Sequence, residues 1–246
     1  MKKYLFLLLI LLNFFTYGQK EYYELRKYEL PYNASETSLH KYFSEALIPA
    51  LNRLGVKNIG VFEALGKQTP KVIYLFIPYK NMTRYAQIFE ALKKDKTYLN
   101  TRAIYDIVPP NKKVYKRFTT SFLIAFDGLP QLIKPKKGTQ IFELRTYEGY
   151  SEDAVRRKVD MFNKEEFSIF DVTGLYSVFF GEQISGPLMP ALTYMLAFES
   201  MEERNNNWEK FSKNPEWKRV SILKEYANTV SDIKRTFLKP VKYSQL

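Results

Sequence analysis

A nine-residue motif occurs twice in the chain, and this duplication constrains the fold more than any other sequence feature. The stretch "YYELRKYEL" at Tyr22–Leu30 returns as "IFELRTYEG" at Ile141–Gly149, 119 positions later. The same register pairs further residues without a gap: Phe43 with Phe162, Gly55 with Gly174, Glu63 with Glu182, Met82 with Met201, Phe89 with Trp208 and Tyr98 with Trp217. Agreement in one register over about 95 residues indicates an internal duplication, and two copies are too few for a solenoid.

Each copy has the same predicted order of elements. Alternating, aromatic-rich strands are expected at 22–30 and 141–149. Helices are expected at Ser35–Leu54, with Ser35 as N-cap and a kink at Pro49, and at Ser151–Val172. Later strands are expected at 56–65, 72–79, 114–126, 175–184, 191–199 and 231–238, and second helices begin near Asn81 and Met201, the latter broken at "NPEW". The resulting βαββαβ order is that of a ferredoxin-like unit.

These elements predict an α+β fold in which two tandem ferredoxin-like repeats form an intrachain pseudo-dimeric α/β barrel. The repeats are expected at residues 20–126 and 141–246, joined by a Pro- and Gly-containing linker at 127–140. A ferredoxin-like unit carries its helices on one face of its sheet. We therefore expect the two bare faces to cover each other and enclose an interior.

The motif places polar and aromatic side chains on one face of a strand, because successive side chains point to opposite sides. The predicted ligand-binding residues are Glu24, Arg26, Tyr28, Glu143, Arg145 and Tyr147. We expect them to face the barrel interior, with arginine addressing an anion or carbonyl, tyrosine donating a hydrogen bond and glutamate orienting the group. The alternative is an internal Glu–Arg ion pair that fixes strand register.

The first residues have the pattern of a secretory signal peptide. Lys2 and Lys3 precede an apolar run from Tyr4 to about Phe15, and small or polar residues follow up to Gln19. The run is too short for a helix that crosses about 30 Å of hydrocarbon. We expect the signal peptide at 1–19 to be cleaved off and the protein to be exported to the periplasm or secreted. After cleavage we expect no stable membrane anchor. The chain has no cysteine, which excludes disulfides, and its net charge of +12 falls to +10 on cleavage.

Metal and cofactor signatures are weak, and the sequence predicts no cofactor and assigns no catalytic residue. His40 is the single histidine, and we expect a boundary residue without a partner rather than a ligand. Glu165, Glu166 and Asp171 are expected on the solvated side of a helix. Trp208, Phe211 and Trp217 are expected to anchor the broken helix to the sheet. Export argues against nucleic acid as the partner of this basic chain.

The chain resembles the NIPSNAP family, most closely in its second half. The resemblance rests on the "ELRxYE" openings, on "WEKFSKNPEWKRV" at 208–220 and on "LKPVKYSQL" at 238–246, and it covers nearly the whole mature chain. It implies the dimeric α/β barrel. Related barrels include haem-degrading and quinone-forming monooxygenases, so fold analogy keeps an enzymatic function open.

Three functions are compatible with these features. The first is the binding of a small, partly apolar ligand between the two repeats, where the duplicated polar trio would meet an aromatic interior. The second is an enzyme of the barrel monooxygenase or isomerase kind. The third is a structural or interaction protein with a packed barrel, and an oligomer is compatible with all three.

Overall fold

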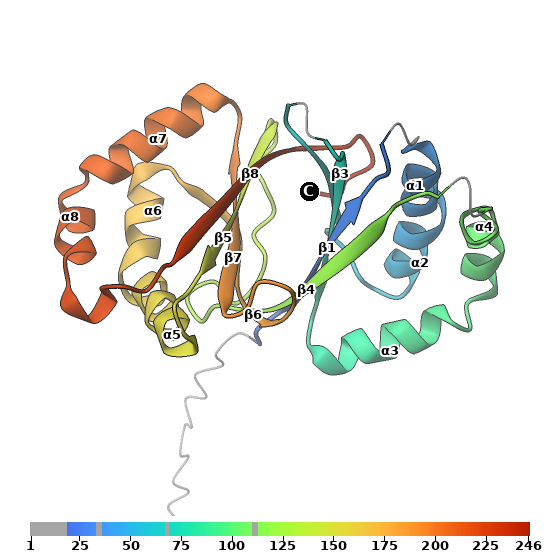
Figure 1. The fold of residues 1–246 in the computed structure, drawn as a ribbon, viewed down its shortest axis with the longest axis horizontal. Helices are drawn as coiled ribbons and strands as arrows, with labels where there is room; N and C mark the ends of the chain where they lie inside the picture. The colour runs from blue at the N-terminus through green and yellow to red at the C-terminus, as the bar shows by residue number, and fades with distance from the viewer. Residues whose placement is uncertain (1–18, 33–35, 67–68, 110–112) are drawn as a thin grey trace, which may run out of the picture.

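The computed structural model describes residues 19–32, 36–66, 69–109 and 113–246. Its fold is mixed α+β, with one closed antiparallel barrel of eight strands and helices outside it. Figure 1 shows the barrel in the middle, with α1–α4 on one side and α5–α8 on the other. The predicted signal peptide at 1–19 and the predicted N-cap at Ser35 fall almost wholly outside the described residues.

The element order is βαββαβ in each half of the chain. The first half contains β1 (Tyr22–Glu29), α1 (Thr37–Lys41), η1 (Tyr42–Leu47), α2 (Ile48–Arg53), β2 (Gly60–Ala64), β3 (Val72–Tyr79), α3 (Met82–Leu92), α4 (Lys96–Asp106) and β4 (Arg117–Ala125). The second contains β5 (Ile141–Glu148), α5 (Glu152–Met161), η3 (Phe162–Glu166), α6 (Phe167–Thr173), β6 (Tyr176–Ser185), β7 (Ala191–Phe198), α7 (Met201–Lys213), α8 (Pro215–Ser221), η4 (Lys224–Tyr226) and β8 (Asp232–Pro240). The predicted strands lie within a few residues of the observed ones, except that β2 is shorter than expected.

The barrel closes through two seams between the halves. Its strand order is β1-β3-β2-β8-β5-β7-β6-β4, so each half contributes four adjacent strands. At one seam β2 pairs with β8, and at the other β4 pairs with β6, both antiparallel. The second seam is tight, because a side chain at Gly181 would meet Leu123 at 2.8 Å. The two sheets therefore form one continuous structure.

Apolar side chains fill the barrel interior. Phe76 stacks on Phe179 across the two halves at 4.5 Å between ring centroids, and Phe62 meets Phe142 at 4.9 Å. The cluster also contains Tyr23, Leu25, Val72, Tyr74, Leu123, Ala125, Leu144, Val178, Met195, Ala197 and Leu238. An eight-stranded barrel has an interior just wide enough for such side chains. The predicted ligand space between the repeats is therefore occupied by the protein's own core.

Helices α3, α4, α5, α7 and α8 begin at residues with capping side chains. Asn81 accepts a hydrogen bond from the backbone of Arg84 at the start of α3, and Ser151 does so from Ala154 at the start of α5. The predicted break at Asn214 is confirmed, and the first half breaks at the equivalent position, where Asp95 caps α4. Sequence analysis did not predict this break in the first half.

Both long helices contain a π-helical segment, η1 and η3, at nearly the same place in the repeat. Pro49 follows η1, but Ser168 occupies its position after η3. Proline is therefore not the cause of this shared feature. Glycines end both helices as predicted, because Gly55 and Gly174 have φ values of +84° and +79°, which favour glycine. In the described part of the chain, no helix has the length and apolarity to cross a membrane.

Truncating an interior aromatic side chain should destabilise the whole barrel, because both halves pack against it. We expect Phe179→Ala to reduce the free energy of unfolding by about 3–5 kcal/mol. The matched substitution Phe89→Ala, at a ring that is 51% exposed, should change it by less than about 1 kcal/mol. Urea unfolding of both variants measures the difference, and equal losses would contradict a barrel core shared by the two halves.

Candidate functional site

The polar residues of the two motifs lie on the outer face of the barrel, beneath the helices. Tyr28 packs edge-on against Phe43 of η1 at 5.3 Å, and Tyr147 contacts Phe162 of η3 at 6.3 Å. Their neighbours Leu25 and Leu144 point inward instead. The expected inward orientation is therefore wrong for all six residues, Glu24, Arg26, Tyr28, Glu143, Arg145 and Tyr147. Alternation could not identify the face, because the helices bury the outer face and the second sheet buries the inner one.

Each motif contains the ion pair that its spacing predicts. Arg26 Nε lies 2.6 Å from Glu24 Oε1, and Arg145 Nε lies 2.7 Å from Glu143 Oε1. Each arginine also points Nη1 towards the motif tyrosine, at 3.5 Å for Tyr28 and 3.2 Å for Tyr147. The same local unit is therefore built twice, and the two copies differ in what covers it.

In the second half, side chains of α7 cover Glu143 and Arg145. Trp208 Nε1 donates to Glu143 Oε2 at 2.9 Å, and Arg204 binds both oxygens of that carboxylate at 2.7 and 2.9 Å. The guanidinium of Arg145 lies 3.8 Å from the centre of the Trp208 ring. Burial alone would raise the pKa of Glu143, but hydrogen bonds from Arg204 and Arg145 hold it below its ordinary value. This copy has the properties of a closed structural ion cluster.

In the first half, the motif borders an open pocket of about 510 Å³. Tyr79 donates to Glu24 at 2.9 Å and takes part of the role that Trp208 and Arg204 have in the other half. The side chain of Arg26 retains 19% of its exposure. The pocket is lined by Arg26, Tyr28, Tyr42, Arg102, Tyr105, Asp106, Val108, Pro109, Lys113, Val114, Tyr115, Lys116, Arg117 and Phe118. This half therefore presents the arginine of the repeated motif to a ligand-sized space.

Aromatic rings form the pocket walls. Tyr42 stacks on Tyr105 at 3.9 Å, with 9° between the ring planes, and Tyr28 stacks on Phe118 at 4.9 Å. Burial raises the pKa of Tyr42 and of Tyr28, the latter against the opposing effect of Arg26. These phenols are consequently neutral at physiological pH and can donate hydrogen bonds.

The two halves differ in the side chains around their motif arginines. Phe89 points outward where Trp208 covers Arg145, so the first half lacks that lid. The pocket residues Tyr42, Arg102, Tyr105 and Tyr115 occupy the positions of Met161, Ser221, Lys224 and Lys234 in the repeat register. Sequence analysis missed these four residues. Their departure from the second copy was the signal that could have identified them.

The predicted packing role of the aromatic residues in α7 and α8 agrees with the structure. Phe211 contacts Trp217 at 4.5 Å and Trp208 at 5.4 Å. The expectation for Glu166 is wrong, because its side chain is buried and forms an ion pair with Lys158. These two residues replace Leu39 and Leu47 of the first half. Burial raises the pKa of Glu166, although Lys158 opposes that shift.

His40 also differs from its expectation. Instead of a boundary residue without a partner, it lies 2.5 Å from the hydroxyl of Tyr243 through Nδ1. Its Nε2 faces Glu36 and Glu63 at 3.7 and 3.5 Å. The sequence could not show this cluster, since its members come from a helix, a strand and the C-terminal segment.

Comparisons with known proteins show a family domain in the second half and a shared fold over the whole chain. Residues 142–245 match the NIPSNAP family model. A NIPSNAP-like domain protein from Burkholderia xenovorans is 21% identical, with 43% of this chain and 88% of that chain covered and a TM-score of 0.39. The comparison with curated proteins gave no match.

Two solved structures are similar over almost the full length of the chain. A candidate monooxygenase from Lactobacillus acidophilus NCFM has a TM-score of 0.56 and 12% identity, covering 90% of this chain and 94% of that one. A second candidate monooxygenase, from Fusobacterium nucleatum, has a TM-score of 0.53 and 12% identity, covering 91% and 93%. At these identities the likeness shows a shared barrel of the dimeric α/β type and nothing of the activity.

The ion cluster around Glu143 should make stability sensitive to acid. Its folded pKa lies below the ordinary value, so the stabilisation is complete above about pH 5 and is lost as the pH falls through the folded pKa. Glu143→Gln should therefore cost about 3–5 kcal/mol at about pH 7, because two buried guanidinium groups lose their counter-charge. At about pH 3.5 the gap between variant and wild type should be smaller.

Urea unfolding at the two pH values measures this gap. Glu45→Gln, at an exposed carboxylate of η1, is the matched control and should leave stability nearly unchanged at both. A gap of equal size for Glu143→Gln at both pH values would show that the charge of this carboxylate does not support the fold.

Proposed function

We propose a function from the pocket in the first half of the chain, the half that lies outside the NIPSNAP match at residues 142–245. The protein binds a small, partly apolar anion at Arg26, between the outer face of β1 and the helices. The observation that carries this proposal is the contrast between the two motifs. Arg145 is covered by Trp208, whereas Arg26 borders a pocket of about 510 Å³.

The charges around the pocket favour an anion. Among its described lining residues, Asp106 is the one carboxylate. Five cationic side chains also line the pocket: Arg26, Arg102, Lys113, Lys116 and Arg117. Asp106 is held by Arg102 Nη2 at 2.7 Å. Glu24 occupies two nitrogens of Arg26 from behind, which leaves Nη1 towards Tyr28 and the pocket. A guanidinium has five N–H donors, so Arg26 can bind a carboxylate, sulfonate or phenolate while it keeps Glu24.

The walls favour an aromatic or otherwise apolar body on that anion. Stacked tyrosine pairs such as Tyr42 and Tyr105 offer flat aromatic faces. Pockets of about 300–1,000 Å³ accept ligands of drug-like size. The ligand class is therefore a small aromatic or partly apolar acid. The earlier expectation of a site between the repeats is replaced by a site within one of them.

A second candidate function is oxidation of such a compound. The similarity to candidate monooxygenases favours it at the level of the fold, and buried neutral phenols beside a guanidinium provide donors for a developing oxyanion. Oxygen uptake in the presence of a quinol, abolished by Arg102→Gln, would identify this activity. A folded protein that shows neither uptake nor binding would favour the structural or interaction role.

We further propose that the halves are tandem ferredoxin-like repeats. Support comes from the repeated element order and from strand orders of 4-1-3-2 type in both halves, β4-β1-β3-β2 and β8-β5-β7-β6. Separately produced residues 20–126 and 141–246 should associate when mixed, because each leaves one apolar sheet face uncovered. Two stable monomers that do not associate would contradict this.

Export through cleavage near residue 19 is also part of the proposal. It is supported by the lysine pair and the short apolar run that follows it in the sequence. Mass spectrometry of protein recovered from outside the cytoplasm should give a mature N-terminus close to Lys20. An intact N-terminus on cytoplasmic protein would contradict export.

The pocket can be tested with 8-anilinonaphthalene-1-sulfonate, an aromatic anion whose fluorescence rises in apolar sites. We expect one molecule per chain, with weaker binding at high salt because the attraction is partly electrostatic. Arg102→Gln should weaken binding by about tenfold through loss of a charged donor. Val108→Trp should block it by filling the space while leaving every charge in place.

Arg156→Gln is the matched control, because this arginine is exposed on α5, far from the pocket, and should leave binding unchanged. Circular dichroism confirms that each variant is folded. If the dye binds all variants equally, its site lies elsewhere and the proposed pocket is wrong.

A further inference from the structure

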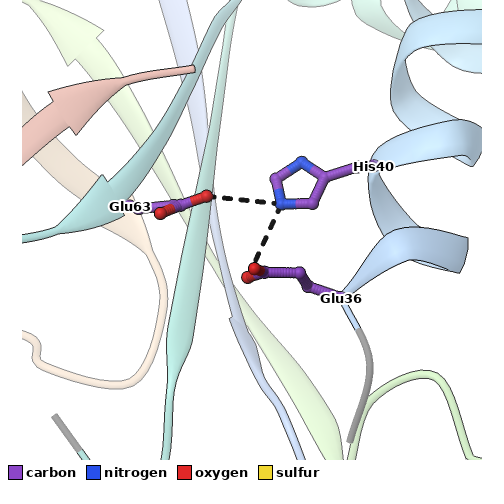
Figure 2. A group of neighbouring side chains, drawn as sticks. All are labelled: Glu36, His40 and Glu63. Atoms are coloured by element: carbon purple, nitrogen blue, oxygen red, sulfur yellow. Dashed lines mark ion pairs between the residues drawn. The ribbon is translucent and has the colours of Figure 1, made fainter. Parts of the chain in front are cut away.

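One histidine and two glutamates converge outside the proposed ligand pocket. Figure 2 shows His40 reaching from α1 towards Glu63 of β2, with Glu36 at the start of the same helix. The three side chains are each partly buried, and their nearest ligand atoms all lie within 4.8 Å of one another. They belong to neither motif and to no part of the Arg26 pocket.

The spacing of these atoms suits a cation between them. His40 Nε2 lies 3.5 Å from Glu63 Oε1 and 3.7 Å from Glu36 Oε2, long for direct hydrogen bonds. Zinc binds histidine nitrogen and carboxylate oxygen at about 2.0–2.2 Å, so neighbouring ligands of a tetrahedral ion lie about 3.4 Å apart. The three side chains therefore need little movement to coordinate one ion.

The histidine ring is oriented by a group on its other side. Nδ1 lies 2.5 Å from Tyr243 Oη. With the imidazole proton on Nδ1, the ring donates to Tyr243 and presents a lone pair on Nε2 to the two glutamates. A partner of this kind on the distal nitrogen is typical of metal-binding histidines.

Two lysines form ion pairs with these carboxylates, and a bound cation would compete with them for the carboxylate oxygens. Lys71 contacts Glu36 Oε2 and lies 3.7 Å from Glu63 Oε2, and Lys239 lies 3.5 Å from that second oxygen. Glu63 Oε1 faces His40 instead. Both lysine side chains are about half exposed, at 45% and 55%, so they can swing into solvent at small cost.

We propose that Glu36, His40 and Glu63 form a binding site for a first-row divalent cation of the Zn²⁺ type. One imidazole nitrogen and two carboxylate oxygens are a ligand set that zinc accepts, with the fourth position left to water. An opening of about 550 Å³ beside the cluster, lined also by Tyr243 and Lys239, gives access from solvent. Bound cation would join α1, β2 and the C-terminal segment, and it would stabilise the folded chain by mass action.

The single histidine makes the test specific. In tag-free full-length protein, imidazole ¹⁵N and ¹H signals report on His40 alone. Zinc titration should shift the Nε2 resonance strongly, with the proton on Nδ1, and should raise the melting temperature. Magnesium, which prefers an all-oxygen octahedral shell, should do neither.

Variants separate metal binding from a purely structural ion network. His40→Gln and Glu63→Gln should each weaken zinc binding at least about tenfold. Lys71→Gln should tighten it, because it removes the cation that competes for Glu36; a structural network would gain nothing from that change. Isothermal titration measures the three affinities. Absence of a zinc-induced shift of the His40 signals at millimolar metal, or weaker zinc binding in Lys71→Gln, would overturn the proposal.

Discussion

Closure of the barrel buries the strands on both faces, and the rest of the structure follows from that constraint. The interior requires apolar side chains, while the helices cover the outer surface. Any charged residue on a central strand must therefore bring its own partner. Glu24 and Arg26, like Glu143 and Arg145, are two residues apart on one face, so each strand carries a neutral pair into the core.

Duplication of this unit allowed the two halves to diverge in what lies over it. In the second half, Trp208 and Arg204 complete the hydrogen bonding of Glu143 and close the space above Arg145. In the first half, Tyr79 on the neighbouring strand donates a hydrogen bond to the Glu24 carboxylate, and Arg26 borders the pocket of about 510 Å³. The second half is therefore closed over its motif, and the first half keeps a space that a ligand can enter.

Much of the fold could be predicted from the sequence, because period-two strands, capping residues and the 119-residue register are local signals. The orientation of the motif could not be predicted from the sequence. Both Leu25 and Arg26 lie in buried surroundings, and alternation alone does not say which of the two faces points into the barrel. Tyr42, Arg102 and Tyr115 approach one another only through packing of helices on the sheet. His40 and Glu63 likewise meet across 23 positions of chain that contain no shared pattern.

The geometry of the barrel, rather than the identity of the ligand, determines where this fold can form a binding site. An eight-stranded barrel is filled by single layers of side chains, so enlarging its interior would remove core aromatics such as Phe76 and Phe179 and destabilise both halves. A space between the sheet and the helices costs less stability, because replacing one covering residue opens it without disturbing the strands. Phe89 takes the place of the covering Trp208 in the first half, where Arg26, paired with Glu24, borders the pocket. A duplicated barrel can therefore acquire a site in one half while the other half preserves the fold.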